Sequence, residues 1–223
     1  MFNDLENKRV IIAGGSGLIG KALVHGFKEV NADVINADKD GGDIPFNIGY
    51  PASRQQLFNK AQKIDVFVNC TYPTDFEAHT LGWFETAEMA CESMLKHKVQ
   101  GSIILFGSIY GVAGHDPSLY WGTTVKPPSG EYVLAKGGVV ALTKHLACKY
   151  GQYGIRVNAI LPGGVLDAKQ DFRFVKKYQA KVPLGRMAEP KDLVGPVLFL
   201  ASEAGAYMTG VSLVVDGGLT CSA

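Results

Sequence analysis

The feature that most constrains the fold is a series of short apolar runs that alternate with longer segments of helical spacing. The runs are rich in Val, Ile and Leu without polar alternation, which predicts strands buried on both faces of a sheet. We expect strands at 9–13, 33–37, 44–46, 66–69, 102–106, 156–161 and 213–215, and helices at 20–30, 52–63, 81–97, 132–150 and 191–201. Such alternation predicts an α/β protein with a doubly wound parallel sheet and helices on both faces.

Length and composition set the expected class of protein. With 223 residues and 47% apolar side chains, the chain is predicted to form one domain over residues 1–223. Segments at about 110–130 and 165–187 are rich in helix breakers and aromatic residues, and we expect them to be substrate loops.

Charge and cysteine content exclude several functions at this stage. The net charge is +1 and is not clustered, so neither nucleic acid nor a membrane surface is an expected partner. The four cysteines are scattered, which predicts no metal site and no disulfide framework. The chain starts without a signal-peptide pattern and has no apolar run of about 20 residues. We therefore expect a cytoplasmic protein that acts on a small molecule.

The stretch "VIIAGGSGLIGKALV" places Gly14, Gly17 and Gly20 between the first strand and the first helix. Glycines here let the backbone approach a pyrophosphate at the helix N-terminus. Asp38 follows 18 residues after Gly20, where a carboxylate would accept hydrogen bonds from ribose hydroxyls and repel a 2′-phosphate. The pattern predicts NAD as the cofactor, with NADP as the alternative because the basic Lys39 comes next.

A strand-end serine and a tyrosine–lysine pair are the candidate catalytic residues. Ser108 follows "SIILFG", and Tyr132 and Lys136 are four residues apart at the start of a helix, so they share one face. Tyr120 is nearer to Ser108 in sequence, but four residues after it stands Thr124, which carries no charge. Two prolines also block a helix that starts before Tyr132. We predict that Tyr132 is the acid/base.

Together, these motifs resemble the short-chain dehydrogenase/reductase family over nearly the whole chain. Further matching motifs are "DVFVN", "IRVNAILPGG", "PLGRMAEPKDL" and "YMTGVSLVVDGG". The resemblance implies a Rossmann-like fold and an oxidoreductase that acts on CH–OH groups with NAD(P). It also implies a homodimer or homotetramer that pairs through the helices at 81–97 and 132–150.

The resemblance also implies residue roles. Tyr132 would exchange a proton with the substrate oxygen, Ser108 would hold that oxygen, and Lys136 would lower the pKa of Tyr132 and hold the nicotinamide ribose. Cofactor contacts are expected at Gly14, Ser16, Gly17, Leu18, Ile19, Gly20, Asp38, Lys39, Asn47, Ile48, Asn69, Cys70, Thr71, Tyr132, Lys136, Pro162, Gly163 and Val165.

Four departures from the family pattern limit what can be transferred. Leu18 stands at the usual position of the middle glycine, and "NCTYPT" replaces the usual Asn-Asn-Ala-Gly, which introduces Tyr72. His79 stands where a helix asparagine commonly completes the catalytic group. We expect His79 either to hold a relay water or to titrate near neutral pH; the alternative is a histidine bonded to backbone. The segment between Ser108 and Tyr132 is about eleven residues longer than usual.

A second, narrower resemblance concerns the substrate. The patterns "NxxYP", "SIYGV", "YxGT", "EYxxxKGG" and "PGG" are similar to the flagellin-modification branch, whose members are oxidoreductases of bacterial surface-sugar biosynthesis. This implies a polar, sugar-like alcohol or ketone, bound by Tyr110, Tyr120 and Trp121 together with Ser108 and Tyr132. The alternative for the aromatic loop is packing on the subunit or on a neighbouring one.

Two other functions remain open at this stage. The stretch "PLGRMAEPKDL" is also typical of 3-oxoacyl-type reductases. The altered "NCTYPT" and His79 leave room for a catalytically silent, NAD-binding regulatory protein.

Overall fold

The computed structural model describes residues 2–73 and 75–221, and its centre is one parallel sheet. The strands are β1 (Arg9–Ala13), β2 (Asp33–Asp38), β3 (Ile44–Pro45), β4 (Val66–Asn69), β5 (Ser102–Phe106), β6 (Arg156–Pro162) and β7 (Ser212–Val215). Their order is β3-β2-β1-β4-β5-β6-β7, and each neighbouring pair is parallel. The predicted doubly wound α/β fold is confirmed.

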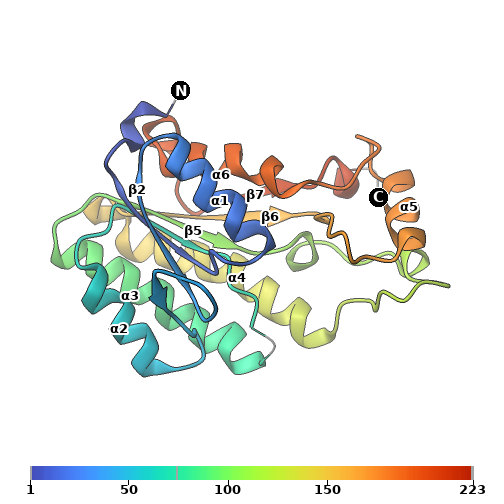
Figure 1. Ribbon diagram of the computed structural model, residues 1–223, viewed down its shortest axis with the longest axis horizontal. Helices are drawn as coiled ribbons and strands as arrows, with labels where there is room; N and C mark the ends of the chain where they lie inside the picture. The colour runs from blue at the N-terminus through green and yellow to red at the C-terminus, as the bar shows by residue number, and fades with distance from the viewer. Residues whose placement is uncertain (1, 74, 222–223) are drawn as a thin grey trace.

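Helices cover both faces of the sheet. They are α1 (Leu18–Glu29), α2 (Pro51–Ala61), α3 (Trp83–Lys96), α4 (Gly130–Tyr150), α5 (Phe172–Lys181) and α6 (Val194–Ala201). Figure 1 shows α1 and α6 on one face and α2, α3 and α4 on the other, while α5 stands apart at one end. Single short turns lie at Asn3–Leu5, Ala78–Gly82, Ile109–Gly111, Pro117–Leu119, Gly151–Tyr153, Pro190–Leu193, Glu203–Gly205 and Leu219–Cys221.

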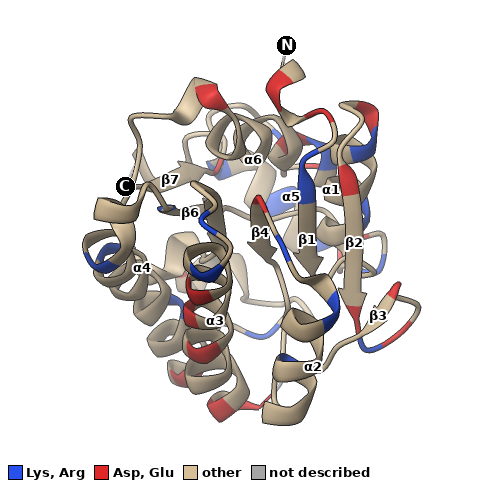
Figure 2. Cartoon of the chain, turned by 90° about the vertical axis from the view of Figure 1, so that its left-hand side faces the viewer, with Lys and Arg blue, Asp and Glu red and all other residues tan. Residues whose placement is uncertain are grey.

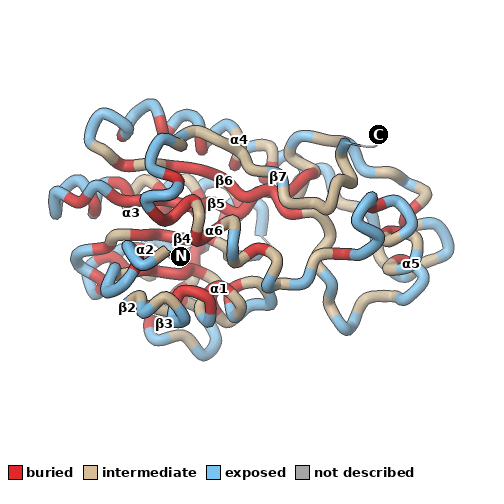
Figure 3. Tube along the Cα trace, turned by 90° about the horizontal axis from the view of Figure 1, so that it is seen from above, coloured by how far each residue is buried: buried red, intermediate tan, exposed pale blue. Residues whose placement is uncertain are grey.

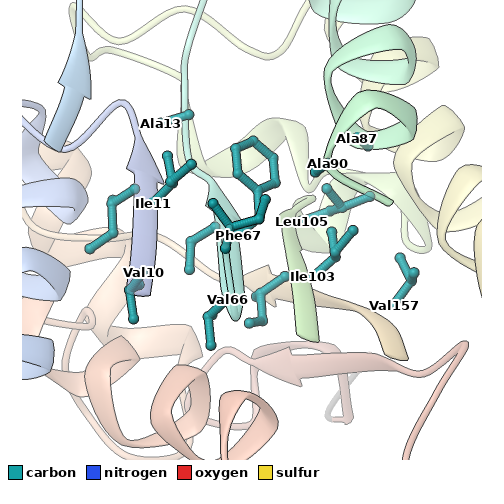
Figure 4. Close-up of a cluster of buried hydrophobic side chains, with 14 of the residues drawn as sticks. Val10, Ile11, Ala13, Val66, Phe67, Ala87, Ala90, Ile103, Leu105 and Val157 are labelled. Carbon is teal, nitrogen blue, oxygen red and sulfur yellow. The ribbon is translucent and has the colours of Figure 1, made fainter. Parts of the chain in front are cut away.

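The core lies between the sheet and its two helical layers. Figure 4 shows Ile11 of β1, Phe67 of β4 and Leu105 of β5 in one cluster, with Ala87 and Ala90 of α3 nearby. Successive strand residues point to opposite faces, and because helices cover both faces, whole strands are buried. Figure 3 shows the same pattern: buried segments follow the strands, whereas the region around α5 is mostly exposed or intermediate.

Several predicted boundaries differ from the observed ones for local reasons. α4 begins at Gly130, two residues before the predicted start, because the Ser129 hydroxyl caps it by accepting a hydrogen bond from the Tyr132 N–H at 3.2 Å. The predicted helix at 191–201 divides into a short turn and α6. α5 falls within the segment predicted as a loop at 165–187, and Asp171 caps it through the Arg173 N–H.

Charges of both signs are interspersed over the side of the molecule seen in Figure 2. Within residues 2–73 and 75–221, no helix combines the length and apolar character needed to cross a bilayer. The same residues contain no group of three or more His, Cys, Asp or Glu side chains placed to hold a metal ion.

Candidate active site

One large cavity lies where the carboxyl ends of the parallel strands meet the N-terminal turns of α1 and α4. Its volume is about 1320 Å³, and it receives residues that follow β1, β2, β4, β5 and β6. Of the predicted cofactor contacts, all except Asn69 line it. Asn69 is fully buried behind the lining, and its Oδ1 accepts hydrogen bonds from the N–H and the hydroxyl of Thr71. Asn69 therefore does not contact the cavity itself, but its side-chain amide positions Thr71, which does line it.

The turn from β1 to α1 is shaped by close backbone contact. Gly14 has φ +86°, which side chains other than glycine rarely adopt, and a Cβ on Gly20 would lie 2.0 Å from the Gly14 carbonyl oxygen. Gly17 precedes the helix without a side-chain cap, and residues 18–20 line the cavity. Because the first N–H groups of a helix have no partner within it, this turn offers donors for an anionic pyrophosphate.

Asp38 ends β2 at the same side of the cavity. Its Oδ2 accepts a hydrogen bond from the Ser16 N–H at 2.9 Å, which fixes the carboxylate beside the glycine turn. Lys39 is exposed, and its Nζ lies 4.0 Å from a carboxylate oxygen of Asp40. Both side chains line the cavity, but only the acidic one is fixed there by a hydrogen bond, while Lys39 is exposed.

Ser108, Tyr132 and Lys136 come together at the opposite end of the cavity. Ser108 follows β5, is buried, and its hydroxyl forms a hydrogen bond with the Tyr132 side chain. Lys136 lies one turn further along α4, where its Nζ donates to the Phe106 carbonyl at 2.9 Å. All three side chains line the same cavity, so the predicted convergence of Ser108, Tyr132 and Lys136 is present in the structure.

The ionisation of this group differs from expectation. Burial raises the pKa of Tyr132 above its ordinary value, and the hydrogen bond with Ser108 opposes that rise. Burial also lowers the pKa of Lys136 to about 8. The prediction that Lys136 depresses the pKa of Tyr132 is not met, because the ammonium is directed to the Phe106 carbonyl and the indole ring of Trp83.

His79 lies next to Tyr132 but behind the cavity surface. Its ring centroid is 6.2 Å from that of Tyr132, and the side chain is 6% exposed. Burial, helped by the positive charge of Lys136, lowers the pKa of His79 to about 4. Titration near neutral pH is thus contradicted. The buried Nε2 has no hydrogen-bond partner among the described residues, which leaves a water-holding role for His79 as a prediction.

Three of the predicted substrate contacts, Tyr110, Tyr120 and Trp121, do not line this cavity, and their role in substrate binding stays a prediction. Tyr110 and Tyr120 share a hydrogen bond between their hydroxyls at 2.7 Å, and the Tyr120 ring packs 5.5 Å from that of Phe174. Trp121 is 69% exposed. Among the described residues, the cavity lining includes none of these three aromatic side chains. The Tyr120 hydroxyl is thus engaged by Tyr110, while its ring packs on α5.

Two residues that the sequence reasoning did not assign lie at the site. Tyr72 is 70% exposed, lines the cavity and has its ring 6.0 Å from that of Tyr132. Trp83 lies under Lys136, with the Nζ 4.6 Å from the ring centroid. The available signals were the position of Tyr72 just after a strand end and the four-residue spacing of His79 and Trp83, which places both on one helical face.

α5 joins the long inserted segment to the site. Asp171 accepts a hydrogen bond from the Thr124 N–H at 2.8 Å, and the Nζ of Lys177 donates to the Ser118 carbonyl at 3.0 Å. On its inner side, the Tyr178 hydroxyl accepts a hydrogen bond from the Gly164 N–H, in the turn after β6. The insert and this turn are thus anchored on the same helix.

A glycine turn, an acidic strand end and a cavity at the carboxyl edge of a doubly wound sheet define a dinucleotide-binding α/β class. The comparisons with known proteins narrow the class. A family model described as enoyl-(acyl carrier protein) reductase matches residues 47–220. A short-chain dehydrogenase from Leptospira borgpetersenii serovar Hardjo-bovis, solved with bound NAD⁺, superposes with a TM-score of 0.88 at 33% identity and covers 99% of this chain and 96% of its own. The chain belongs to the short-chain dehydrogenase/reductase family.

Curated relatives include enzymes of sugars and polyols. An L-rhamnose 1-dehydrogenase (NAD(P)(+)) of a Sphingomonas species is 31% identical, with 96% of this chain and 97% of the relative covered. Post-translational flagellin modification protein A of Campylobacter coli is 30% identical, with 96% and 98% covered. A ribulose-forming D-arabinitol 2-dehydrogenase of Scheffersomyces stipitis is 36% identical over 74% of this chain. The match covers 60% of that relative's length.

Proposed function

We propose that this chain is an NAD(H)-dependent oxidoreductase that interconverts a secondary alcohol and a ketone on a polar, sugar-like metabolite. The observation that carries the proposal is the convergence of Ser108, Tyr132 and Lys136 on the cavity that the glycine turn and Asp38 also line. Binding groups for a dinucleotide thus lie at one end of the cavity, and proton-transfer groups lie at the other.

The residues present fit a nicotinamide dinucleotide. The glycine turn leaves room for a pyrophosphate, and a fixed carboxylate suits two ribose hydroxyls better than a 2′-phosphate. Pro162, Gly163 and Val165 also line the cavity that Lys136 lines, and a nicotinamide and its ribose would be held there. When bound, the nicotinamide supplies or accepts the hydride.

The side chains supply proton transfer and orientation. Because its pKa is raised, Tyr132 is a protonated phenol at neutral pH, which suits it to donate a proton to a ketone oxygen. The Ser108 hydroxyl, already bonded to Tyr132, would hold that same oxygen. Lys136, whose Nζ lies 5.8 Å from the centroid of the Tyr132 ring, would hold the nicotinamide ribose, the second role that the family resemblance implies for it.

The sugar-like substrate is supported by the relatives and by the cavity mouth. By their names, the rhamnose and arabinitol dehydrogenases act on polyhydroxylated compounds. At the mouth, Tyr72 offers an aromatic face, and Asp75 and Gln170 offer polar groups. A 3-oxoacyl-type reductase is the second candidate function, because the description of the matching family model is enoyl-(acyl carrier protein) reductase.

An absorbance assay at the reduced nicotinamide band would test the proposal with a panel of polyols, aldoses and acyl ketones. We expect turnover with polyhydroxylated alcohols and NAD. Tyr132→Phe should abolish turnover while NADH binding, followed by fluorescence, stays largely intact. Tyr120→Phe is the matched control and should retain turnover. Consumption of acyl ketones alone would overturn the sugar assignment, and NADH binding without any substrate would favour a silent regulatory protein.

Assembly, location and loop function are further proposals. A homodimer or homotetramer, a cytoplasmic location and a small-molecule partner, with neither nucleic acid nor membrane as partner, stay predictions, as does the single domain over residues 1–223. For the substrate loops, we propose that the 165–187 segment closes over bound ligand, since Asp167 and Gln170 line the cavity. Light scattering during gel filtration would measure the assembly.

A further inference from the structure

The ammonium of Lys136 is buried without an anionic partner. Its side chain is 3% exposed, and within the part of the chain that the structure describes, no carboxylate forms an ion pair with it. The ionisable groups that face it are Cys70 after β4, His79 before α3, and Tyr132 on its own helix.

These three neighbours are all neutral near pH 7. Burial raises the pKa of Cys70 to about 12, burial lowers the pKa of His79 to about 4, and the pKa of Tyr132 is raised. A buried charge without a counter-ion is costly unless dipoles or polarisable groups stabilise it. The stabilisation of Lys136 must therefore come from uncharged groups.

Two such groups contact the Nζ. The Lys136 ammonium has three N–H donors, and one of them forms a hydrogen bond with the Phe106 carbonyl at 2.9 Å. The indole ring of Trp83 lies on another side, with its centroid 4.6 Å from the Nζ, and this ring is 1% exposed. An indole is the best aromatic partner for a cation, and the attraction is larger where water is excluded. The remaining direction is open to the cavity, which Lys136 lines.

We propose that Trp83 is a positioning residue whose indole face holds the Lys136 ammonium at the cavity and keeps it charged. The functional consequence rests on the proposed role of Lys136, but the contact itself can be measured without any substrate. Trp83 is the first residue of α3, whose side chains pack in the core, so the indole is a fixed platform. Lys136 belongs to α4, and the contact therefore links two helices at the site.

The direction of the effect follows from the charge. Loss of the indole face destabilises the ammonium relative to the neutral amine, so Lys136 should lose its proton at a lower pH. For a desolvated cation–π contact the expected shift is about one pH unit, from about 8 toward about 7. Trp83→Phe keeps a weaker face and should shift the midpoint by less than Trp83→Leu.

Tryptophan fluorescence provides a test that leaves Trp83 in place. The chain has two tryptophans, so Trp121→Phe makes Trp83 the sole indole. We expect its emission to change with a midpoint near pH 8, and we expect this transition to disappear in Trp121→Phe/Lys136→Met. A pH-independent emission, or the same transition without the lysine, would overturn the proposal.

A second measurement follows the lysine directly. With lysine labelled with ¹³C at Cε, the resonance absent from Lys136→Met identifies Lys136, and its midpoint is followed in wild type, Trp83→Phe and Trp83→Leu. The proposal requires the midpoint to fall in that order, with the alkaline limit of turnover moving in parallel. Folded variants whose stability falls while the midpoint stays fixed would show a packing role only. If no substrate is turned over, the oxidoreductase proposal fails, whereas the two titrations still decide the role of Trp83.

Discussion

Tyr178→Phe isolates one hydrogen bond by which α5 holds the turn after β6. The Tyr178 hydroxyl accepts from the Gly164 N–H, and the ring is 2% exposed. Removing only the oxygen leaves that part-buried N–H without its acceptor. An unsatisfied buried donor costs about 1–3 kcal/mol. For a chain of this length, each kcal/mol lowers the Tm by about 2–4 °C, so the Tm should fall by roughly 2–12 °C.

The same substitution should weaken cofactor binding more than it changes chemistry. Gly163 and Val165 flank the freed N–H and both line the cavity, so a looser turn raises the Kd for NADH while kcat changes little. Differential scanning fluorimetry and NADH titration measure the two effects. Tyr207→Phe is the matched control, because that side chain is fully exposed and should change neither quantity. Equal Tm and Kd in Tyr178→Phe and wild type would refute the reasoning.

Three further substitutions test other parts of the site. Asp38→Asn keeps an acceptor for the Ser16 N–H but removes the charge, so the preference for NADH over NADPH should fall at least about tenfold, as competitive fluorescence titration would show. Ser129→Ala removes the cap of α4 and should lower stability by about 1 kcal/mol in urea unfolding, with Ser129→Asp close to wild type. The pKa of His79 is about 4 in the folded chain and about 6.5 in the unfolded chain. Between these two pH values the imidazole is protonated in the unfolded chain and neutral in the folded one, so folding loses stability as the pH falls. Wild type should therefore lose about 2 kcal/mol more stability than His79→Gln between pH 7 and pH 5; equal losses would contradict a buried neutral imidazole.

The fold was predictable because its signals are local and agree with one another. Strands buried on both faces need uninterrupted apolar runs, and every predicted strand is present in the sheet. α5 was missed because its segment is polar and short, and its helix is stabilised by contacts with a distant part of the chain, such as Asp171 with Thr124. A cap residue explains the shifted start of α4, because Ser129 begins this helix earlier than the proline pattern alone indicates.

The site was predictable where residue type and strand position decide the placement. The glycine turn, Asp38, Ser108, Tyr132 and Lys136 each follow a strand or begin a helix at the carboxyl edge of the sheet, so they meet at one cavity. Electrostatics were less predictable, because the pKa of a group depends on the neighbours that exclude water. The sequence shows that Lys136 is four residues from Tyr132. It does not show that the Lys136 ammonium contacts the Trp83 ring and donates a hydrogen bond to the Phe106 carbonyl.

The choice between Tyr120 and Tyr132 illustrates how an insertion can mislead a rule based on spacing. Tyr120 is twelve residues after Ser108, whereas Tyr132 is twenty-four residues after it. The intervening segment packs outward on α5, where Lys181 pairs with Asp116 and Lys177 binds the Ser118 carbonyl. It then returns at the cap of α4, where the Tyr132 side chain can bond to Ser108. Because lengthening a loop costs little entropy, the extra residues leave the paired side chains in place. The lysine that follows Tyr132 by one helical turn is therefore a better guide to which tyrosine lies beside Ser108 at the cavity than the distance in sequence from that serine.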